Sequence, residues 1–170
     1  RVRISSSAYE PSQKKMSSNK SSDEKFKDAL NALQSGNLNY AEEIYLDCID
    51  NGLVSHIIFA NLGAISLLRN DWSNSISYLK KALLINKDDS NSLNNLAIAY
   101  KELKNYPKAL DYAFKSIRIK DSNPNYYKTL ALIYLDCGDI SNSIKYLNKV
   151  INLEPSSAQA YSLLGKAFRL

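Results

Sequence analysis

Glycine, proline, cysteine and long apolar runs are all scarce in this chain, which has 5 Gly, 4 Pro and 2 Cys among its 170 residues. No segment approaches the roughly 18 consecutive apolar residues that a membrane-spanning helix needs. The basic N-terminus also lacks the apolar stretch and small-residue cleavage site of a secretory signal. With 45% hydrophobic residues, the chain can still bury the core of one ordinary domain. We therefore expect a soluble, cytoplasmic protein with no membrane partner.

The residues that carry most enzyme chemistry are also sparse. Cys48 and Cys137 are too far apart in the sequence for a metal-ligand motif, and we interpret both as reduced, small hydrophobic residues. His56 is the only histidine, and no cysteine or carboxylate cluster at ligand spacing lies near it in the sequence. No Gly-rich phosphate loop or nucleophile motif occurs. We expect no catalytic residue, no metal and no cofactor, and hence a chain that is not an enzyme.

The formal net charge of +5 is concentrated at the N-terminus. Residues 1–21 hold five basic residues and one acidic residue, a net charge of +4, which leaves +1 for the rest of the chain. The remaining charges are interpreted as scattered, with both signs mixed, whereas phosphate binding needs Lys and Arg gathered on one face. Nucleic acid is therefore not an expected partner.

Residues 1–21 are rich in Ser and Lys and lack apolar periodicity, so burial cannot offset the entropy of ordering them. We expect them to form a basic tail. Met16 is the only methionine and precedes a stretch that resembles a native beginning. Residues 1–15 are accordingly interpreted as vector-derived or as the trimmed end of a longer chain.

From residue 22 onward the sequence repeats itself every 34 residues. The two halves of each period are separated by a short polar break, at Gly36, Asn70, Lys104 and Gly138. The pattern predicts two helices per period, which cross where only a small residue lets the backbones approach. A large apolar residue followed by a small one recurs at the same spacing, at Leu62, Leu96, Leu130 and Leu164, followed by Gly63, Ala97, Ala131 and Gly165.

Turns and periodicity together predict a chain of short helices without strands. Pro107 and Pro124 fit the first turns of two of them, where a missing N–H costs little. The predicted helices lie at 23–35, 38–50, 56–69, 72–85, 90–103, 106–118, 124–137, 140–153 and 158–170. Four repeats follow, at 22–55, 56–89, 90–123 and 124–157, with the first helix of a fifth at 158–170.

These repeats resemble the tetratricopeptide repeat (TPR) family, and their style is similar to that of bacterial arrays. The likeness is strongest in LNNLAIAYKELKNYPKA (93–109), YKTLALIY (127–134) and YSLLGKAF (161–168). The resemblance implies an all-α fold, a right-handed superhelical solenoid of antiparallel helix pairs. The first repeat has Asp28 where the family has Leu, and of the four proline positions only Pro155 is occupied. We therefore expect the first repeat to be looser and cap-like.

Solenoids of this kind bind partners along a concave wall lined by the first helix of each repeat. Two rungs, Asn61 and Asn95, are similar to the asparagine ladder with which arrays of O-linked sugar transferases hold an extended peptide. Lys27, Thr129 and Leu163 occupy the other rungs. The inward positions are predicted to be Ile57, Ala60, Ala64 and Leu67, then Asn91, Asn94, Ile98 and Lys101, then Asn125, Lys128, Leu132 and Leu135, and finally Gln159, Ser162, Lys166 and Arg169.

The candidate partner-binding residues combine these two sets. A structural role stays open for them, because Asn is abundant throughout the chain and lysines on helices are more often solvated than bound to a ligand. The 12 tyrosines are interpreted as core-packing residues. The candidates are Asn61, Asn91, Asn94, Asn95, Ile98, Lys101, Asn125, Lys128 and Lys166.

Two functions are consistent with this reading. One is a protein-interaction scaffold that binds a peptide segment or partner protein in the groove. The other is the substrate-recruiting array of a larger modifying enzyme, such as a glycosyltransferase or a sulfotransferase. The family's clamp for C-terminal carboxylates is incomplete here, so chaperone tails are not expected ligands. Because no capping helix follows Phe168, we expect self-association through the C-terminal helix or further sequence after Leu170.

Overall fold

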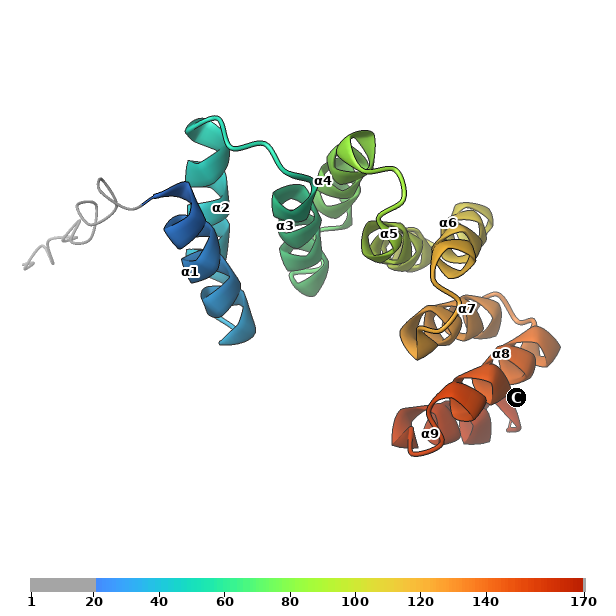
Figure 1. Ribbon diagram of the computed structural model, residues 1–170. Helices are drawn as coiled ribbons and strands as arrows, with labels where there is room; N and C mark the ends of the chain where they lie inside the picture. Colours follow the sequence, from blue (N-terminus) through green and yellow to red (C-terminus); the bar gives the residue numbers. More distant parts are fainter. Residues whose placement is uncertain (1–20, 170) are drawn as a thin grey trace, which may run out of the picture. The chain divides into compact units, whose positions relative to one another are not determined.

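The computed structural model describes residues 21–169, so the predicted tail lies outside the described residues except for Ser21. Within this range the chain forms nine α-helices and no strand (Figure 1). Each helix begins and ends within a few residues of its predicted position. The helices are α1 (Ser22–Gln34), α2 (Leu38–Asp50), α3 (His56–Leu68), α4 (Trp72–Ile85), α5 (Ser90–Glu102), α6 (Tyr106–Ile119), α7 (Pro124–Asp136), α8 (Ile140–Leu153) and α9 (Ala158–Ala167).

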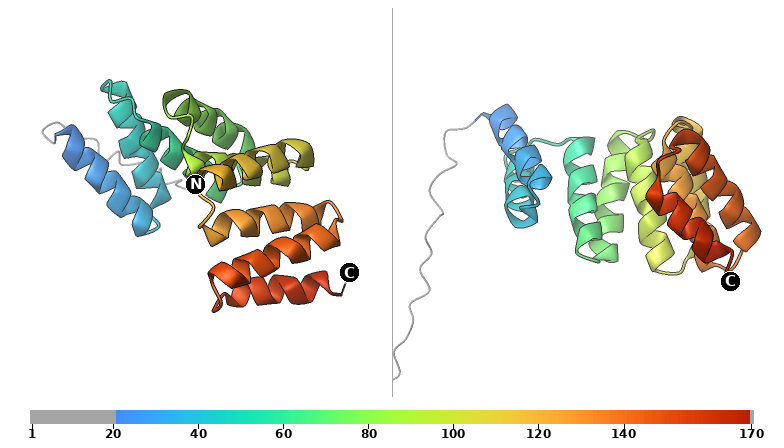
Figure 2. Two further views of the ribbon diagram at one scale, coloured as in Figure 1. Left: turned by 45° about the vertical axis from the view of Figure 1, so that its right-hand side comes forward. Right: turned by 90° about the horizontal axis from the view of Figure 1, so that it is seen from below.

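The chain divides into two compact units, the first ending at Leu53 and the second beginning at Val54. In the first unit α1 packs against α2. In the second, the pairs α3–α4, α5–α6 and α7–α8 follow one another, and each second helix also packs against the next first helix. The first helices α3, α5 and α7 contact one another in that order. Figure 2 shows these pairs from two further directions.

The connection that links the two units differs from those inside the second unit. Gly52, after α2, has a φ of 84°. The residues that follow α4, α6 and α8 are instead extended, with φ of −132° at Asn86, −142° at Lys120 and −138° at Glu154. Three connections within the second unit therefore share one backbone form, and the link at Gly52 does not.

Short polar side chains begin most of the helices. The residue before each of α1 to α8 is Ser, Asp or Asn, and its side chain accepts a hydrogen bond from a backbone N–H of the first turn. Pro107 and Pro124 lie in the first turns of α6 and α7, as predicted. These caps satisfy N–H groups of the first turn that have no partner within the helix.

The turn inside each pair depends on one residue with a left-handed backbone. Gly36, Asn70, Lys104 and Gly138 have φ of 78°, 59°, 56° and 86°. These are the four polar breaks at the 34-residue spacing, so the repeat in the sequence corresponds to a repeat in backbone conformation. Gly adopts this conformation freely because it has no Cβ, and Asn tolerates it because its short polar side chain can hydrogen-bond locally, whereas the Cβ of a lysine opposes it without such compensation.

The first and second helices of a pair cross at the small residues. A Cβ added to Gly63 would lie 2.6 Å from Leu79 Cγ and 2.7 Å from Leu79 Cδ2, so α3 and α4 meet at this glycine. Ala97 and Ala131, at the same repeat position, are buried in α5 and α7. Gly165 in α9 has no atom within 4 Å of an added Cβ. The predicted close approach is confirmed at Gly63 and is not made at Gly165.

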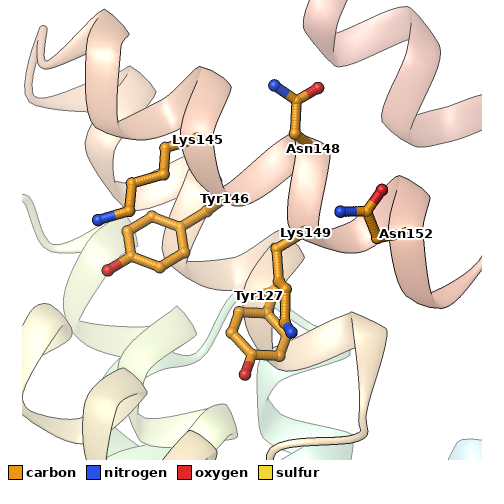
Figure 3. A pocket seen from close by; sticks show the side chains of 6 residues that line it. All are labelled: Tyr127, Lys145, Tyr146, Asn148, Lys149 and Asn152. Carbon is orange, nitrogen blue, oxygen red and sulfur yellow. The ribbon is translucent and has the colours of Figure 1, made fainter.

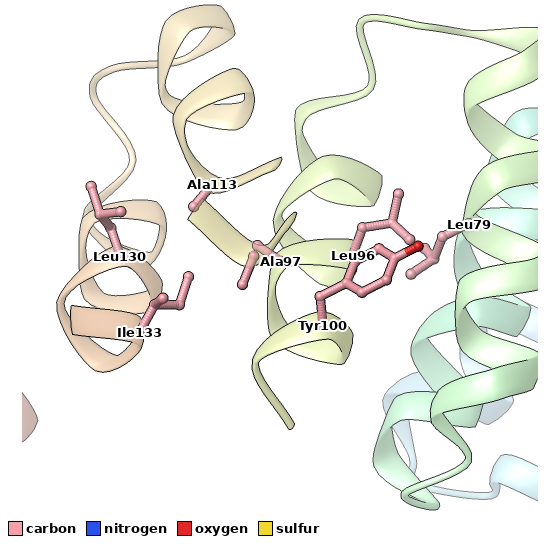
Figure 4. Close-up of a cluster of buried hydrophobic side chains, with 8 residues drawn as sticks. Leu79, Leu96, Ala97, Tyr100, Ala113, Leu130 and Ile133 are labelled. Atoms are coloured by element: carbon pink, nitrogen blue, oxygen red, sulfur yellow. The ribbon is translucent and has the colours of Figure 1, made fainter. Parts of the chain in front are cut away.

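Side chains from successive pairs share one hydrophobic cluster. Figure 4 shows Leu96, Ala97 and Tyr100 of α5 lying between Leu79 of α4 and Leu130 of α7. Leu79, Leu96 and Leu130 are fully buried. Because the cluster contains residues of three consecutive pairs, packing is continuous along the second unit.

The two cysteines differ in exposure. Both are free, in agreement with their interpretation as reduced residues, and Cys48 is buried whereas Cys137, which follows α7, is exposed. Apolar side chains are also exposed near the end of the described residues, where Tyr161 of α9 is 51% exposed and Phe168, which follows α9, is 69% exposed.

Substituting Gly63 by Ala is expected to lower the free energy of unfolding by about 1–3 kcal/mol, because the new methyl group overlaps buried Leu79. The matched control is Gly165→Ala, where the space is open. It should raise stability by about 0.5–1 kcal/mol through helix propensity. Urea unfolding followed by circular dichroism measures both. Equal effects of the two substitutions would contradict the crossing at Gly63.

Substituting Lys104 by Gly is expected to raise the free energy of unfolding by about 0.5–1 kcal/mol, because it relieves the left-handed backbone at φ 56°. Lys120→Gly is the control, since this exposed lysine also follows a helix but has a φ of −142°. It should lose stability. Thermal unfolding compares them, and a gain in both variants would show that the strain at Lys104 is not the cause.

Candidate functional site

Polar side chains join the first helices of neighbouring pairs. The hydroxyl of Tyr126 in α7 donates a hydrogen bond to Asn91 Oδ1 in α5 at 2.7 Å. The same hydroxyl lies 2.9 Å from Ser90 Oγ. Further along, Lys128 Nζ in α7 donates to Gln159 Oε1 in α9 at 3.0 Å. We use the term first-helix face for the predicted inward positions of α3, α5, α7 and α9.

Lys101 on this face is paired within the protein. Its Nζ lies 2.7 Å from Glu102 Oε1 and 3.4 Å from Asp136 Oδ2, and its side chain is only 14% exposed. Burial alone lowers the pKa of Lys101, but the hydrogen bond to Glu102 and the charges of both carboxylates outweigh it and raise the pKa above its ordinary value. Two acidic neighbours therefore neutralise the lysine that the sequence suggested as a basic contact.

Asn94 lies between these two contacts on the same stripe of α5. Asn91, Asn94 and Lys101 are spaced by three and seven residues, which places them on one side of a helix. Asn91 and Lys101 both contact α7, at Tyr126 and Asp136. Asn94 is 8% exposed, and its Oδ1 has no hydrogen-bond partner in the described part of the chain. An unpaired buried acceptor of this kind costs about 1–3 kcal/mol.

The remaining candidate residues differ in exposure. Asn125 and Lys166 are exposed, and both are available to a partner. Ile98 and Asn95 in α5 are half-buried, as is Lys128 in α7. Asn61 in α3 is half-buried and already interacts within the protein.

The apolar end of the first-helix face lies on α3. Ile57 is 42% exposed, and Ala60, Ala64 and Leu67 are half-buried. Leu135 differs from its predicted role, because it is 7% exposed and packs in a cluster around Ala131, Leu147 and Ala167. It belongs to the core between helices and is not a contact residue.

A separate pocket of about 300 Å³ lies beside α8. Its lining comes from α8 and from Tyr127 near the start of α7, and Figure 3 shows the two tyrosine rings with a lysine beside each. Burial, followed by the charge of Asp121, raises the pKa of Tyr127, so its hydroxyl is neutral at pH 7. The lining residues are Tyr127, Lys145, Tyr146, Asn148, Lys149 and Asn152.

Within residues 21–169, no group of three or more His, Cys, Asp or Glu side chains is placed to hold a metal ion. His56 lies at the first position of α3 and is half-buried. Searching the same residues, we found no helix with the length and apolar character of a membrane span.

Three models of one protein family match the sequence. A TPR repeat model matches residues 131–169, and two tetratricopeptide repeat models match residues 58–91 and 78–111. The chain is a tetratricopeptide repeat protein. No curated protein matches its sequence.

Solved structures of other TPR proteins share the fold. The Cut9–Hcn1 hetero-tetramer of the APC/C matches with a TM-score of 0.82 and 22% identity, over 86% of this chain but only 30% of that one. TTC0263, a thermophilic TPR protein of Thermus thermophilus, matches with a TM-score of 0.77 and 17% identity, over 89% and 83% of the two chains. The first TPR domain of Spaghetti (RPAP3), bound to the HSP90 peptide SRMEEVD, matches with a TM-score of 0.65 and 17% identity, over 68% and 94%. The predicted all-α solenoid of helix pairs is thus confirmed.

The charge pairing of Lys101 predicts a measurable effect on stability. Asp136→Asn should lower the free energy of unfolding at pH 7 by about 1 kcal/mol, because a half-buried ammonium loses a charged partner. The control is Asp111→Asn, which removes an exposed pair with Lys115. It should change stability by less than about 0.5 kcal/mol.

The same pair predicts a pH dependence. A raised pKa in the folded state means that the unfolded chain releases its proton first, so stability falls as the pH rises above about 10.4. This loss should be smaller in Asp136→Asn than in the parent. Urea unfolding of both proteins between neutral and alkaline pH measures the difference, and parallel profiles would contradict the pairing.

Proposed function

We propose that this TPR protein is a protein-interaction scaffold that binds an extended peptide segment along the first-helix face of α3, α5 and α7. The observation that carries the proposal is the unpaired oxygen of Asn94. This oxygen is itself shielded from solvent, so we infer that the amide of Asn94 turns toward the surface when a peptide binds. A backbone N–H of the peptide can then donate to the oxygen and remove the cost of leaving it unpaired. Asn94 would then contact the bound peptide, whereas Asn91 and Lys101 beside it hold α5 against α7.

The chemistry of the peptide follows from the two ends of the face. The α3 end offers the partly exposed apolar residues Ile57 and Leu67. The α7 and α9 end offers Lys128 and Lys166, and Lys101 adds no net charge because its carboxylate partners neutralise it. We therefore infer a ligand with apolar side chains toward one end and carboxylates toward the other.

The comparisons support this class of function at the level of the fold. The TPR domain of Spaghetti was solved with a bound peptide, so the same helix pairs hold a peptide in that protein. At 17% identity the likeness does not extend to the ligand. The HSP90 tail is therefore not carried over to this chain.

Asn94→Leu tests the proposal, because it keeps the size of the side chain and removes the acceptor. The variant should be more stable than the parent by about 1 kcal/mol, since an unpaired buried oxygen is lost. It should bind at least about 10-fold more weakly to peptides selected with the parent protein from a random library on phage, a change of about 1.4 kcal/mol. Fluorescence anisotropy measures the affinity, and urea unfolding measures the stability.

The control is Asn148→Leu, an equivalent change on α8 away from the first-helix face. It should leave the affinity for the same peptides unchanged. Selected peptides that bind Asn94→Leu as tightly as the parent, or that respond only to Asn148→Leu, would refute binding on the first-helix face.

A further inference from the structure

The second helices of the second unit have a strongly one-sided charge. There are two basic residues in α4, three in α6 and two in α8, against a single acidic residue, Asp111. The first helices α3, α5 and α7 are balanced, with Lys101 and Lys128 against Glu102 and Asp136. The expectation that charges after the tail are scattered with both signs mixed is therefore wrong for these helices. It failed because the opposite charges lie mainly in α2, which holds four acidic residues and no Lys or Arg, and in the connections.

These cations are exposed, and most have no acidic partner among the described residues. All seven are exposed to solvent. Lys115 pairs with Asp111 at 2.7 Å, on a surface where both side chains are at least half exposed. Across residues 21–169 the other six make no ion pair. The six are Lys80, Lys81, Lys108, Arg118, Lys145 and Lys149.

Three of the lysines belong to a repeated motif. Tyr78, Tyr112 and Tyr146 recur every 34 residues, and each is followed three positions later by Lys81, Lys115 or Lys149. Residues three apart lie on the same side of a helix, so α4, α6 and α8 each present a Tyr–Lys pair at one repeat position. A feature that recurs on three helices at one position forms a row along the stack.

The tyrosine rings hold the lysines in place. Lys81 Nζ lies 5.7 Å from the centre of the Tyr78 ring, and Lys115 Nζ lies 5.3 Å from that of Tyr112. In the last pair, Lys145 lies over Tyr146 at 5.5 Å and Lys149 over Tyr127 at 5.7 Å. A cation over a ring keeps its stem on apolar surface and its ammonium in water. The row is therefore partly ordered before any partner binds.

Apolar side chains lie among these charges. Leu84 of α4 is 87% exposed, and Phe114 of α6 is 43% exposed and contacts Tyr146 of α8 edge to face, with ring centres 6.4 Å apart. The pocket beside α8 adds the amides of Asn148 and Asn152 to the lysines at its rim. A surface of cations and amides around apolar side chains matches an amphipathic segment that carries acidic residues beside apolar ones.

We propose that the outer sides of α4, α6 and α8 form a second binding surface, which takes an acidic, amphipathic protein segment. We favour a protein segment over nucleic acid as the ligand, because nucleic-acid bases stack on exposed aromatic rings. The tyrosine rings here are buried or half-buried and lie under lysines, so they are not free for base stacking. This surface is separate from the first-helix face, and the proposal does not depend on peptide binding there.

Charge reversal tests the proposal. The variant Lys81→Glu, Lys115→Glu, Lys149→Glu changes the same repeat position on all three second helices. The control, Lys87→Glu, Lys104→Glu, Lys120→Glu, makes the same change in net charge at exposed residues of the connections. The probe is a fluorescein-labelled peptide of about 18 residues, or five helical turns, with Glu on one face and Leu and Phe on the other.

We expect the parent to bind this peptide, and added salt up to about 0.5 M to weaken the binding. The first variant should bind at least about 10-fold more weakly, and the control within about 2-fold of the parent. The Asn94→Leu variant should bind it as the parent does, so a failure of the first-helix face would not affect this result.

Equal losses in the two triple variants would overturn the proposal, because they would show attraction by net charge alone. Two further probes under the same conditions are a single-stranded oligothymidine and vesicles that contain phosphatidylserine. Tighter binding of either of these than of the peptide, with the same dependence on Lys81, Lys115 and Lys149, would also overturn it. The surface would then belong to nucleic acid or to anionic membranes.

Discussion

The close approach of two helices at a residue without a large side chain is the constraint on which the second unit depends. At Gly63 the contact is so tight that a single methyl group would overlap Leu79. Ala97 and Ala131 occupy the same position in the next two pairs and are buried as well. Because each pair is held at a short distance, the leucines beside these residues meet those of the next pair and form one cluster. Gly165 lacks this contact and is open.

Stacking pairs in this way separates two surfaces with different chemistry. On the first helices, polar groups contact the neighbouring helix, as Tyr126 does with Asn91 and Lys101 with Asp136. Lys101 is neutralised by these contacts, and one buried side-chain oxygen on the described first helices, Oδ1 of Asn94, has no hydrogen-bond partner. On the second helices the lysines lie over tyrosine rings and keep their charge. We propose the first face as a site for the backbone of a peptide and the second as a site for an acidic segment.

Most of the fold could be predicted because it depends on local chemistry that repeats. Gly36, Asn70, Lys104 and Gly138 share a left-handed backbone, and their spacing in the sequence revealed the turns. Short polar caps and prolines fixed the helix starts. Two features were misread, namely the inward role of Leu135 and the distribution of charge. The lysines of α4, α6 and α8 could have been found, since the Tyr–Lys spacing is periodic, but their charges were counted along the chain and not by helix.

The sequence by itself determined the helices, the turns and the small residues at the crossings, because these depend on residue type and on the 34-residue period. Only the tertiary structure decided which polar side chains have a hydrogen-bond or ion-pair partner. Lys101 and Asp136 are separated by 35 positions, and their contact depends on how closely α7 lies against α5. The burial of Asn94 depends on the same packing. A period places residues in equivalent positions, but hydrogen bonds and ion pairs form only within a few ångströms, a distance that helix packing sets.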